Sequence, residues 1–235
     1  MYKQLNEKME TYSLPDGLKA IADLFPGKVA FSSSMGQEDQ VITDSIFTNR
    51  IPIRVFTIDT GRLFNETYEL IERTNSRYKQ NVQVYFPESA DVENFATAKG
   101  INSFYESIDN RKECCSIRKV KPLNRALEGA KVWITGLRAE QSANRSNMSI
   151  IAWDELRQLY KFNPLINWTY NEVVDYLKEF NVPYSSLHDK GFISIGCAPC
   201  TRAVAPGEDA RAGRWWWETS QKECGLHQTT QKEKI

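Results

Sequence analysis

The sequence predicts an α/β protein whose open, mainly parallel sheet carries helices on both faces. Short apolar runs of strand length alternate with longer stretches in which apolar residues recur at helical spacing. Polar loops that contain serine, threonine or glycine follow three of the apolar runs. This alternation is typical of parallel sheets, because a crossover helix must return the chain before the next strand begins.

The expected elements follow this alternation from the N-terminus. Strands are expected within residues 27–34, 51–61, 81–87, 131–138 and 159–168, and helices at residues 16–24, 38–47, 63–78 and 170–182. The helix at 38–47 places Val41, Ile42 and Ile46 on one face. The last helix has Thr169 as its N-cap and stops before Pro183.

Length and charge narrow the classes of function. At 235 residues we expect one α/β domain over residues 1–214 and a mobile C-terminal tail over residues 215–235. The 30 basic residues balance the 30 acidic ones, so no overall field favours nucleic acid or an anionic membrane. Because no signal peptide or membrane-length apolar run occurs, we expect a cytoplasmic protein.

Four of the five cysteines form two pairs, Cys114 with Cys115 and Cys197 with Cys200. In a reducing cytosol such pairs indicate metal or redox chemistry, and four thiols can bind one zinc ion or one iron-sulfur cluster. Adjacent residues on a helix point about 100° apart, so both thiols reach one centre only if it bridges them or the helix is distorted. A four-iron cluster suits this arrangement better than zinc.

The fifth cysteine, Cys224, remains for chemistry. Lys222 and His227 lie near it in the sequence and can shift its thiol toward the nucleophilic thiolate. Two arginines three residues apart, Arg211 and Arg214, can clamp an oxyanion, although surface charge is an equally good interpretation of their spacing.

Three polar loops at strand ends are candidate ligand sites, because ligands of open parallel sheets collect there. The first contains Ser32, Ser33, Ser34 and Gly36 just before a helix, which suits a phosphate. The second contains Asp59, Thr60 and Gly61, and the third ends at Arg138. Neither GxxxxGK[ST] nor GxGxxG occurs, which argues against P-loop and dinucleotide-binding proteins.

These motifs together resemble the sulfonucleotide reductases, and among them the iron-sulfur-containing adenosine 5′-phosphosulfate reductases of assimilatory sulfate reduction. The resemblance runs from the SSSMGQED loop through KECCSIRK, SIGCAPC and GRWWWE to KECGLH. The fold it implies is similar to the adenine nucleotide alpha hydrolase-like fold of the PP-loop superfamily. The serine loop lacks the double glycine of SGGxDS loops, which argues against ATP cleavage.

The resemblance implies a role for each matching residue. Cys114, Cys115, Cys197 and Cys200 would ligate a 4Fe-4S cluster, and Cys224 would be the catalytic nucleophile. The nucleotide would be bound by Ser32, Ser33, Ser34, Gly36, Ile58, Asp59, Thr60 and Gly61. The phosphosulfate would be held by Lys119, Arg138, Arg211 and Arg214.

The implied reaction converts adenosine 5′-phosphosulfate to sulfite and AMP through an S-sulfocysteine, with thioredoxin as electron donor. A homo-oligomer is also implied. Three alternatives stay open: a reductase of 3′-phosphoadenosine 5′-phosphosulfate or of both substrates, a metal-cluster protein that senses a nucleotide without turning it over, and a PP-loop enzyme that adenylates its substrate.

Overall fold

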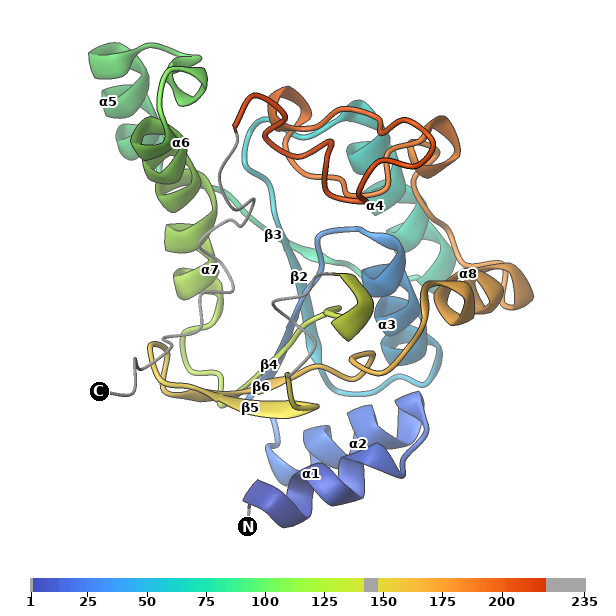
Figure 1. Ribbon diagram of the computed structural model, residues 1–235. Coiled ribbons are helices and arrows are strands. Elements are labelled where there is room, and N and C mark those ends of the chain that lie inside the picture. The colour runs from blue at the N-terminus through green and yellow to red at the C-terminus, as the bar shows by residue number, and fades with distance from the viewer. Residues whose placement is uncertain (1, 142–147, 219–235) are drawn as a thin grey trace, which may run out of the picture. The chain divides into compact units, whose positions relative to one another are not determined.

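The computed structural model describes residues 2–141 and 148–218 (Figure 1). Its six-stranded sheet has the order β3-β2-β1-β4-β6-β5. The strands are β1 (Val29–Ser32), β2 (Arg54–Ile58), β3 (Gln83–Tyr85), β4 (Val132–Ile134), β5 (Ile151–Asp154) and β6 (Leu159–Phe162). Parallel pairs join β1 to β2 and β4, and β4 to β6, whereas β5 is antiparallel to β6. The predicted α/β class with a mainly parallel sheet is therefore confirmed.

The chain forms two compact units. Unit 1 comprises the chain up to Thr57 together with Glu66–Gln83 and Gly129–Ser186. Unit 2 comprises Ile58–Asn65, Val84–Glu128 and the chain from Leu187 on. The single domain expected over residues 1–214 stays a prediction.

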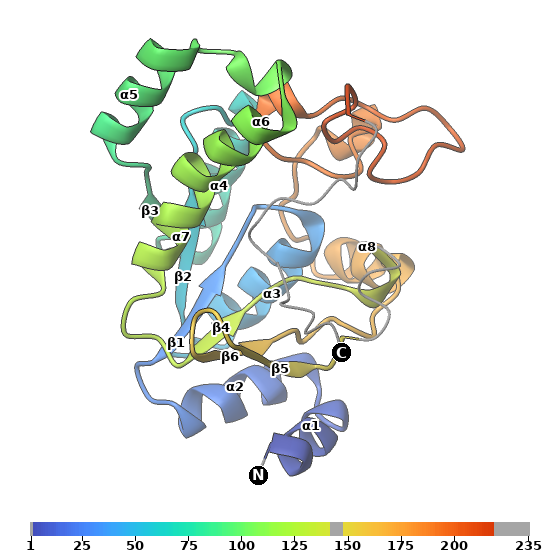
Figure 2. The same ribbon diagram turned by 60° about the vertical axis from the view of Figure 1, so that its left-hand side comes forward.

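Unit 1 holds most of the sheet and the helices that pack beside its strands. These helices are α1 (Tyr2–Glu10), α2 (Leu14–Leu24), α3 (Gln37–Thr48), α4 (Asn65–Tyr78) and α8 (Tyr170–Glu179). Asp44 on α3 accepts hydrogen bonds from the hydroxyls of Tyr78 (2.7 Å) and Tyr176 (2.8 Å), which ties α4 and α8 to α3. Both views show α8 beside α3 (Figures 1 and 2). Phe31, Ile42 and Phe162 are among the fully buried residues of the core.

Unit 2 holds three successive helices and a loop-rich segment at residues 187–218 (Figure 2). The helices are α5 (Ser89–Lys99), α6 (Ile108–Cys115) and α7 (Lys121–Ala126). A π-helical turn, Ser116–Val120, joins α6 to α7. Short 3₁₀ turns occur in the chain at Ser103–Tyr105, Ala139–Gln141, His188–Lys190 and Ala198–Cys200.

The segment at the expected start of the tail is packed into unit 2. Trp215 has 1% of its surface exposed, and Glu218 is buried as well. Cys224 lies outside the described residues.

Among the described residues, no helix combines the length and apolar character needed to span a membrane.

Candidate functional site

The structure brings the four paired cysteines together in unit 2. Cys115, Cys197 and Cys200 are buried, Cys114 is partly buried, and they pack around Phe104 and Trp215. All four line one pocket. The same pocket is lined by the cationic side chains of Arg62, Arg111, Arg118 and Lys119. Two sequence motifs separated by about eighty residues thus form one thiol site surrounded by positive charge.

Local backbone structure explains how each pair reaches the site. Ser107 caps α6 by accepting a hydrogen bond from the backbone N–H of Asn110. The helix ends at Cys115, directly before the π-helical turn. A π-helical turn is a distortion of regular helix geometry, and such distortions are frequent at functional sites. The second pair lies on a tight turn in which the N–H of Cys200 donates to the carbonyl of Cys197 (2.9 Å).

Burial and neighbouring cations shift the thiol pKa values in opposite directions. Burial raises the pKa of Cys200 to about 12, and the negative charge of Cys197 adds to this rise. Burial also raises the pKa of Cys114. At Cys197 burial likewise acts to raise the pKa, but Lys119 and the Thr60 hydroxyl are among the groups that outweigh it, so the pKa lies below the ordinary value. The neighbouring cations therefore favour the thiolate at Cys197, whereas burial favours the neutral thiol at Cys114 and Cys200.

Four thiols lining one pocket are a donor set that fits a 4Fe-4S cluster. Within the described part of the chain, no three His, Cys, Asp or Glu side chains are arranged to hold a metal ion. Structural zinc needs its ligands around one tetrahedral centre. A 4Fe-4S cluster is held by four thiolates, each on a different iron, so its ligands are spread more widely.

Thr60 lies at the thiol site. Its hydroxyl is 3.2 Å from the sulfur of Cys197, and its carbonyl accepts a hydrogen bond from Arg118 (2.7 Å). The backbone N–H of Gly61 donates to the carboxylate of Asp59 (2.7 Å), and Gly61 has φ +70°, a left-handed conformation that favours glycine. Ile58, the last residue of β2, precedes this turn.

Arg214 and Arg211 differ in their surroundings. Arg214 is buried, its guanidinium lies 4.7 Å from the ring centre of Trp215, and its charge lowers the pKa of Cys197. Its Nε is a buried donor without a hydrogen-bond partner among the described residues. Arg211 lies in the preceding turn, where its backbone N–H donates to Asp209 (2.8 Å).

The serine loop in unit 1 is held by its own hydrogen bonds. Ser32 accepts from the indole of Trp133 (2.7 Å), and the backbone N–H of Ser33 donates to the carbonyl of Phe56 (2.7 Å). Ser34 donates its N–H and its hydroxyl to the carboxylate of Asp39. The loop ends at Gly36, the N-cap residue of α3.

Asp39 is a buried carboxyl group that the sequence motifs did not single out. Burial raises its pKa to about 7, although the hydrogen bonds from Ser34 act in the opposite direction. A Cβ atom at Gly136 would lie 2.1 Å from the Asp39 carboxylate, so only glycine fits there. The TG sequence after β4 is the signal that could have pointed to this close approach.

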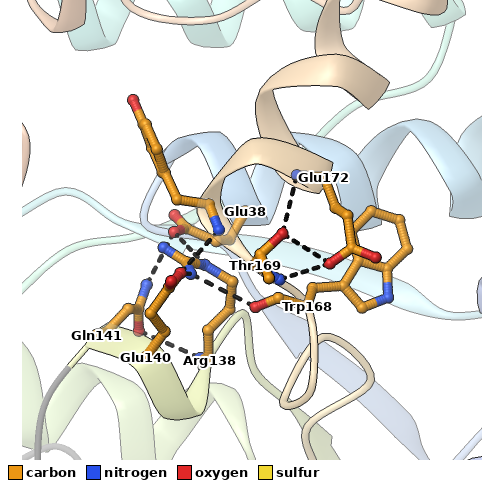
Figure 3. Close-up of polar contacts among 8 residues, drawn as sticks. Glu38, Arg138, Glu140, Gln141, Trp168, Thr169 and Glu172 are labelled. Carbon is orange, nitrogen blue, oxygen red and sulfur yellow. Dashed lines mark hydrogen bonds and ion pairs between the residues drawn. The ribbon is translucent and has the colours of Figure 1, made fainter.

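Arg138 is neutralised by two carboxylates in unit 1 (Figure 3). Its guanidinium binds Glu38 at 2.9 Å and Glu140 at 2.7 Å. Gln141 also donates to Glu38 (2.9 Å), and Glu140 accepts from the N–H of Tyr170, the first residue of α8. The predicted role of Arg138 toward phosphosulfate stays a prediction, and it requires an anion to compete with these carboxylates.

The fold and the site define an α/β protein that carries a buried four-cysteine site in one of its two units. Residues 28–203 match the model of the phosphoadenosine phosphosulfate reductase domain. The chain belongs to this family.

Curated relatives extend the match over nearly the whole chain. An adenosine 5′-phosphosulfate reductase of Sinorhizobium fredii strain USDA 257 is 49% identical over 226 residues, which cover 96% of this chain and 90% of the relative. One of Rhizobium meliloti strain 1021 is 49% identical over 223 residues, 94% of this chain and 84% of the relative.

Solved structures resemble the fold. The phosphoadenylyl-sulfate reductase of Candida auris superposes with a TM-score of 0.73 at 28% identity, covering 86% of this chain and 95% of that chain. The FMN adenylyltransferase of Candida glabrata gives a TM-score of 0.54 at 16% identity, covering 91% and 79%, and shows a shared fold alone.

Proposed function

We propose that this protein reduces adenosine 5′-phosphosulfate to sulfite and AMP in assimilatory sulfate reduction, with thioredoxin as the electron donor. The observation that carries the proposal is the assembly of Cys114, Cys115, Cys197 and Cys200 among cations, in a chain 49% identical to adenosine 5′-phosphosulfate reductases. Reduced thioredoxin requires a reducing compartment, which is consistent with the expected cytoplasmic location.

The first chemical step is assigned to Cys224. Its thiolate attacks the sulfate sulfur, the bond from that sulfur to the bridging phosphate oxygen breaks, and AMP leaves with the electron pair. The enzyme then carries an S-sulfocysteine. Positive side chains lower the repulsion between the anionic Cys224 thiolate and the anionic substrate. They also stabilise the negative charge that moves to the phosphate of the departing AMP.

The second step returns the enzyme to its starting state. A thioredoxin thiolate attacks the sulfur of Cys224, and sulfite leaves with the electron pair of the broken sulfur–sulfur bond. The second thioredoxin thiol resolves the mixed disulfide and frees Cys224. The dithiol supplies both electrons, so no other reductant is needed.

The four paired cysteines would hold a 4Fe-4S cluster. Bound there, the cluster would act as a fixed charged group beside the cations rather than as an electron carrier, since the thiols account for both electrons. Lys119 suits a role toward both the thiolates and an anionic substrate, because it lines their pocket and lowers the pKa of Cys197.

Substrate contacts follow the residues expected from the sequence. The loop of Ser32, Ser33, Ser34 and Gly36 at the start of α3 is assigned to the nucleotide, with the turn from Ile58 to Gly61 as a second contact. Arg214 is the best supported of the arginines assigned to the phosphosulfate, because its buried Nε has no hydrogen-bond partner among the described residues. Assignment of Arg138 and Arg211 to the same group, and a homo-oligomer, rest on the resemblance alone.

Turnover with defined substrates tests the proposal. Anaerobic protein is supplied with reduced thioredoxin and either adenosine 5′-phosphosulfate or its 3′-phosphorylated form, and sulfite and AMP are quantified. We expect equal amounts of sulfite and AMP from the first substrate and little from the second. Preference for the phosphorylated form would show a 3′-phosphoadenosine 5′-phosphosulfate reductase. Binding of either substrate without turnover would support a protein that senses a nucleotide. Release of pyrophosphate from ATP would support an enzyme that adenylates its substrate.

A further inference from the structure

A buried ion pair joins Arg111, on the helix that carries Cys114 and Cys115, to Glu218 near the end of the described chain. Arg111 on α6 donates Nε and Nη2 to the two carboxylate oxygens of Glu218, each at 2.9 Å. The side chains are 2% and 4% exposed. The two residues are 107 positions apart in the sequence, so the contact is specific to the folded chain.

Arg111 also contacts the thiol site. It lies four residues before Cys115 on the same helix face, and the two side chains form a hydrogen bond. Its guanidinium stacks on Trp215 with 4.7 Å to the ring centre. Arg111 thus connects a predicted cluster ligand with Glu218 on the C-terminal segment.

The pair fixes the position of Glu218, the point from which the chain continues toward Cys224. Cys224 lies six positions after Glu218 in the sequence. Even a fully extended chain spans only about 3.6 Å per residue, so six positions of chain reach at most roughly 22 Å from the anchored Glu218. Tethering a nucleophile near its target raises its effective concentration, and the gain is lost when the tether point moves.

The type of contact suits an anchor rather than general packing. A bidentate arginine–carboxylate pair fixes orientation as well as distance, and burial protects it from competing water. A buried ion pair contributes little net stability over an apolar contact of the same size, but removing one partner leaves an uncompensated charge.

We propose that Arg111 and Glu218 are positioning residues that anchor the C-terminal segment beside the thiol site, so that Cys224 reaches the sulfate sulfur. The inference rests on the proposed function, because it uses Cys224 as the nucleophile. Neither residue touches the reacting atoms in this role.

Glu218→Ala tests the anchor, and Glu208→Ala is its matched control. Glu208 forms a bidentate pair with Arg202 at 2.8 and 3.0 Å in the same unit, but that pair is more than one-third exposed. Each protein is mixed with one equivalent of adenosine 5′-phosphosulfate without thioredoxin. The rate of sulfo transfer to Cys224 is followed by intact mass, and iron content and substrate affinity are measured on the same samples.

For Glu218→Ala we expect sulfo transfer roughly 10- to 100-fold slower, with iron content and substrate affinity unchanged. Glu218→Gln, which keeps one acceptor oxygen, should lie between this variant and the wild type, and Glu208→Ala should match the wild type. As a readout independent of activity, trypsin should cleave after Lys222 faster in Glu218→Ala than in Glu208→Ala.

If Glu218→Ala kept its iron and transferred the sulfo group as fast as the wild type, the proposed anchoring role would be wrong. Iron loss in proportion to the rate loss in both Glu218 variants would also overturn it, since the pair would then act by holding the thiol site. A wild-type protein that gains no sulfo group at all would instead contradict the proposed function, which separates the two failures.

Discussion

The hydroxyl of Thr60 lies 3.2 Å from the sulfur of Cys197. The sequence places Thr60 at the end of a strand and predicts a nucleotide contact, whereas the structure places its hydroxyl against a predicted cluster ligand. The Thr60 hydroxyl is one of the groups that hold the pKa of Cys197 below its ordinary value. Thr60 therefore tunes a thiol through a hydrogen bond that favours the thiolate.

Thr60→Val should raise the pKa of Cys197, because valine has nearly the shape of threonine but no hydroxyl. Thr60→Ser, which keeps the hydroxyl, should stay close to the wild type. Ultraviolet absorbance of the thiolate during a pH titration of metal-free protein measures the shift. Equal titration curves for the valine and serine variants would show that the hydroxyl has no effect on the thiol.

Asp39→Asn should change how stability depends on pH. The ordinary pKa of an aspartate is 3.8, and burial raises that of Asp39 to about 7. Between these values the unfolded chain has released the proton while the folded chain still holds it, so wild-type stability falls as the pH rises from about 4 to about 7. Asparagine cannot ionise and avoids this loss.

The difference in unfolding free energy, wild type minus Asp39→Asn, should fall by up to roughly 4 kcal/mol across that pH range. Urea unfolding of both proteins at a series of pH values measures it, and the subtraction removes the contribution of other titrating groups. A difference independent of pH would show that Asp39 titrates in its ordinary range.

Arg138→Ala should destabilise unit 1 strongly. Its side chain is 6% exposed and that of Glu38 is 16% exposed, so the substitution leaves a largely buried carboxylate without its main partner. A loss of about 3 kcal/mol is expected from urea unfolding. Glu140→Ala is the matched control, because the Glu140 side chain is 58% exposed and solvent screens its pairing with Arg138. Similar losses in both variants would contradict this account of the network.

Thr169→Ala should remove the cap at the start of α8. Thr169 and Glu172 form a capping box in which each side chain accepts from the backbone of the other (Figure 3). Loss of a threonine cap costs about 1 kcal/mol of stability. Thr169→Asn keeps a capping oxygen and should recover most of the lost stability. If urea unfolding gave Thr169→Asn and Thr169→Ala the same free energy of unfolding, the role of the cap would be contradicted.

Most elements of unit 1 could be predicted because their sequence patterns are local, although α1 was not expected. Val29–Phe31 form the apolar run of β1, and the apolar face of residues 38–47 packs in the core as part of α3. β5 was missed because it leaves Trp153 45% exposed, so its pattern does not resemble a buried strand. α5 was missed because Phe95 is its one buried residue.

The site could be predicted only in part. Residue types and spacing indicated that the cysteine pairs form one site, and all four cysteines line one pocket. The pairing of Arg111 with Glu218 could not be predicted, because a contact over 107 positions depends on the tertiary fold. The π-helical turn after Cys115 has no sequence signature of its own.

The central claim is that Cys224 is a nucleophile that takes a sulfo group from adenosine 5′-phosphosulfate. Its most direct test is the intact mass of anaerobically purified, iron-replete protein after mixing with this substrate in the absence of thioredoxin. We predict a gain of one sulfo group in the wild type, an equal amount of released AMP, and no gain in Cys224→Ser. A wild-type protein that binds the substrate and gains no mass, or a Cys224→Ser variant that gains as much as the wild type, would contradict the claim.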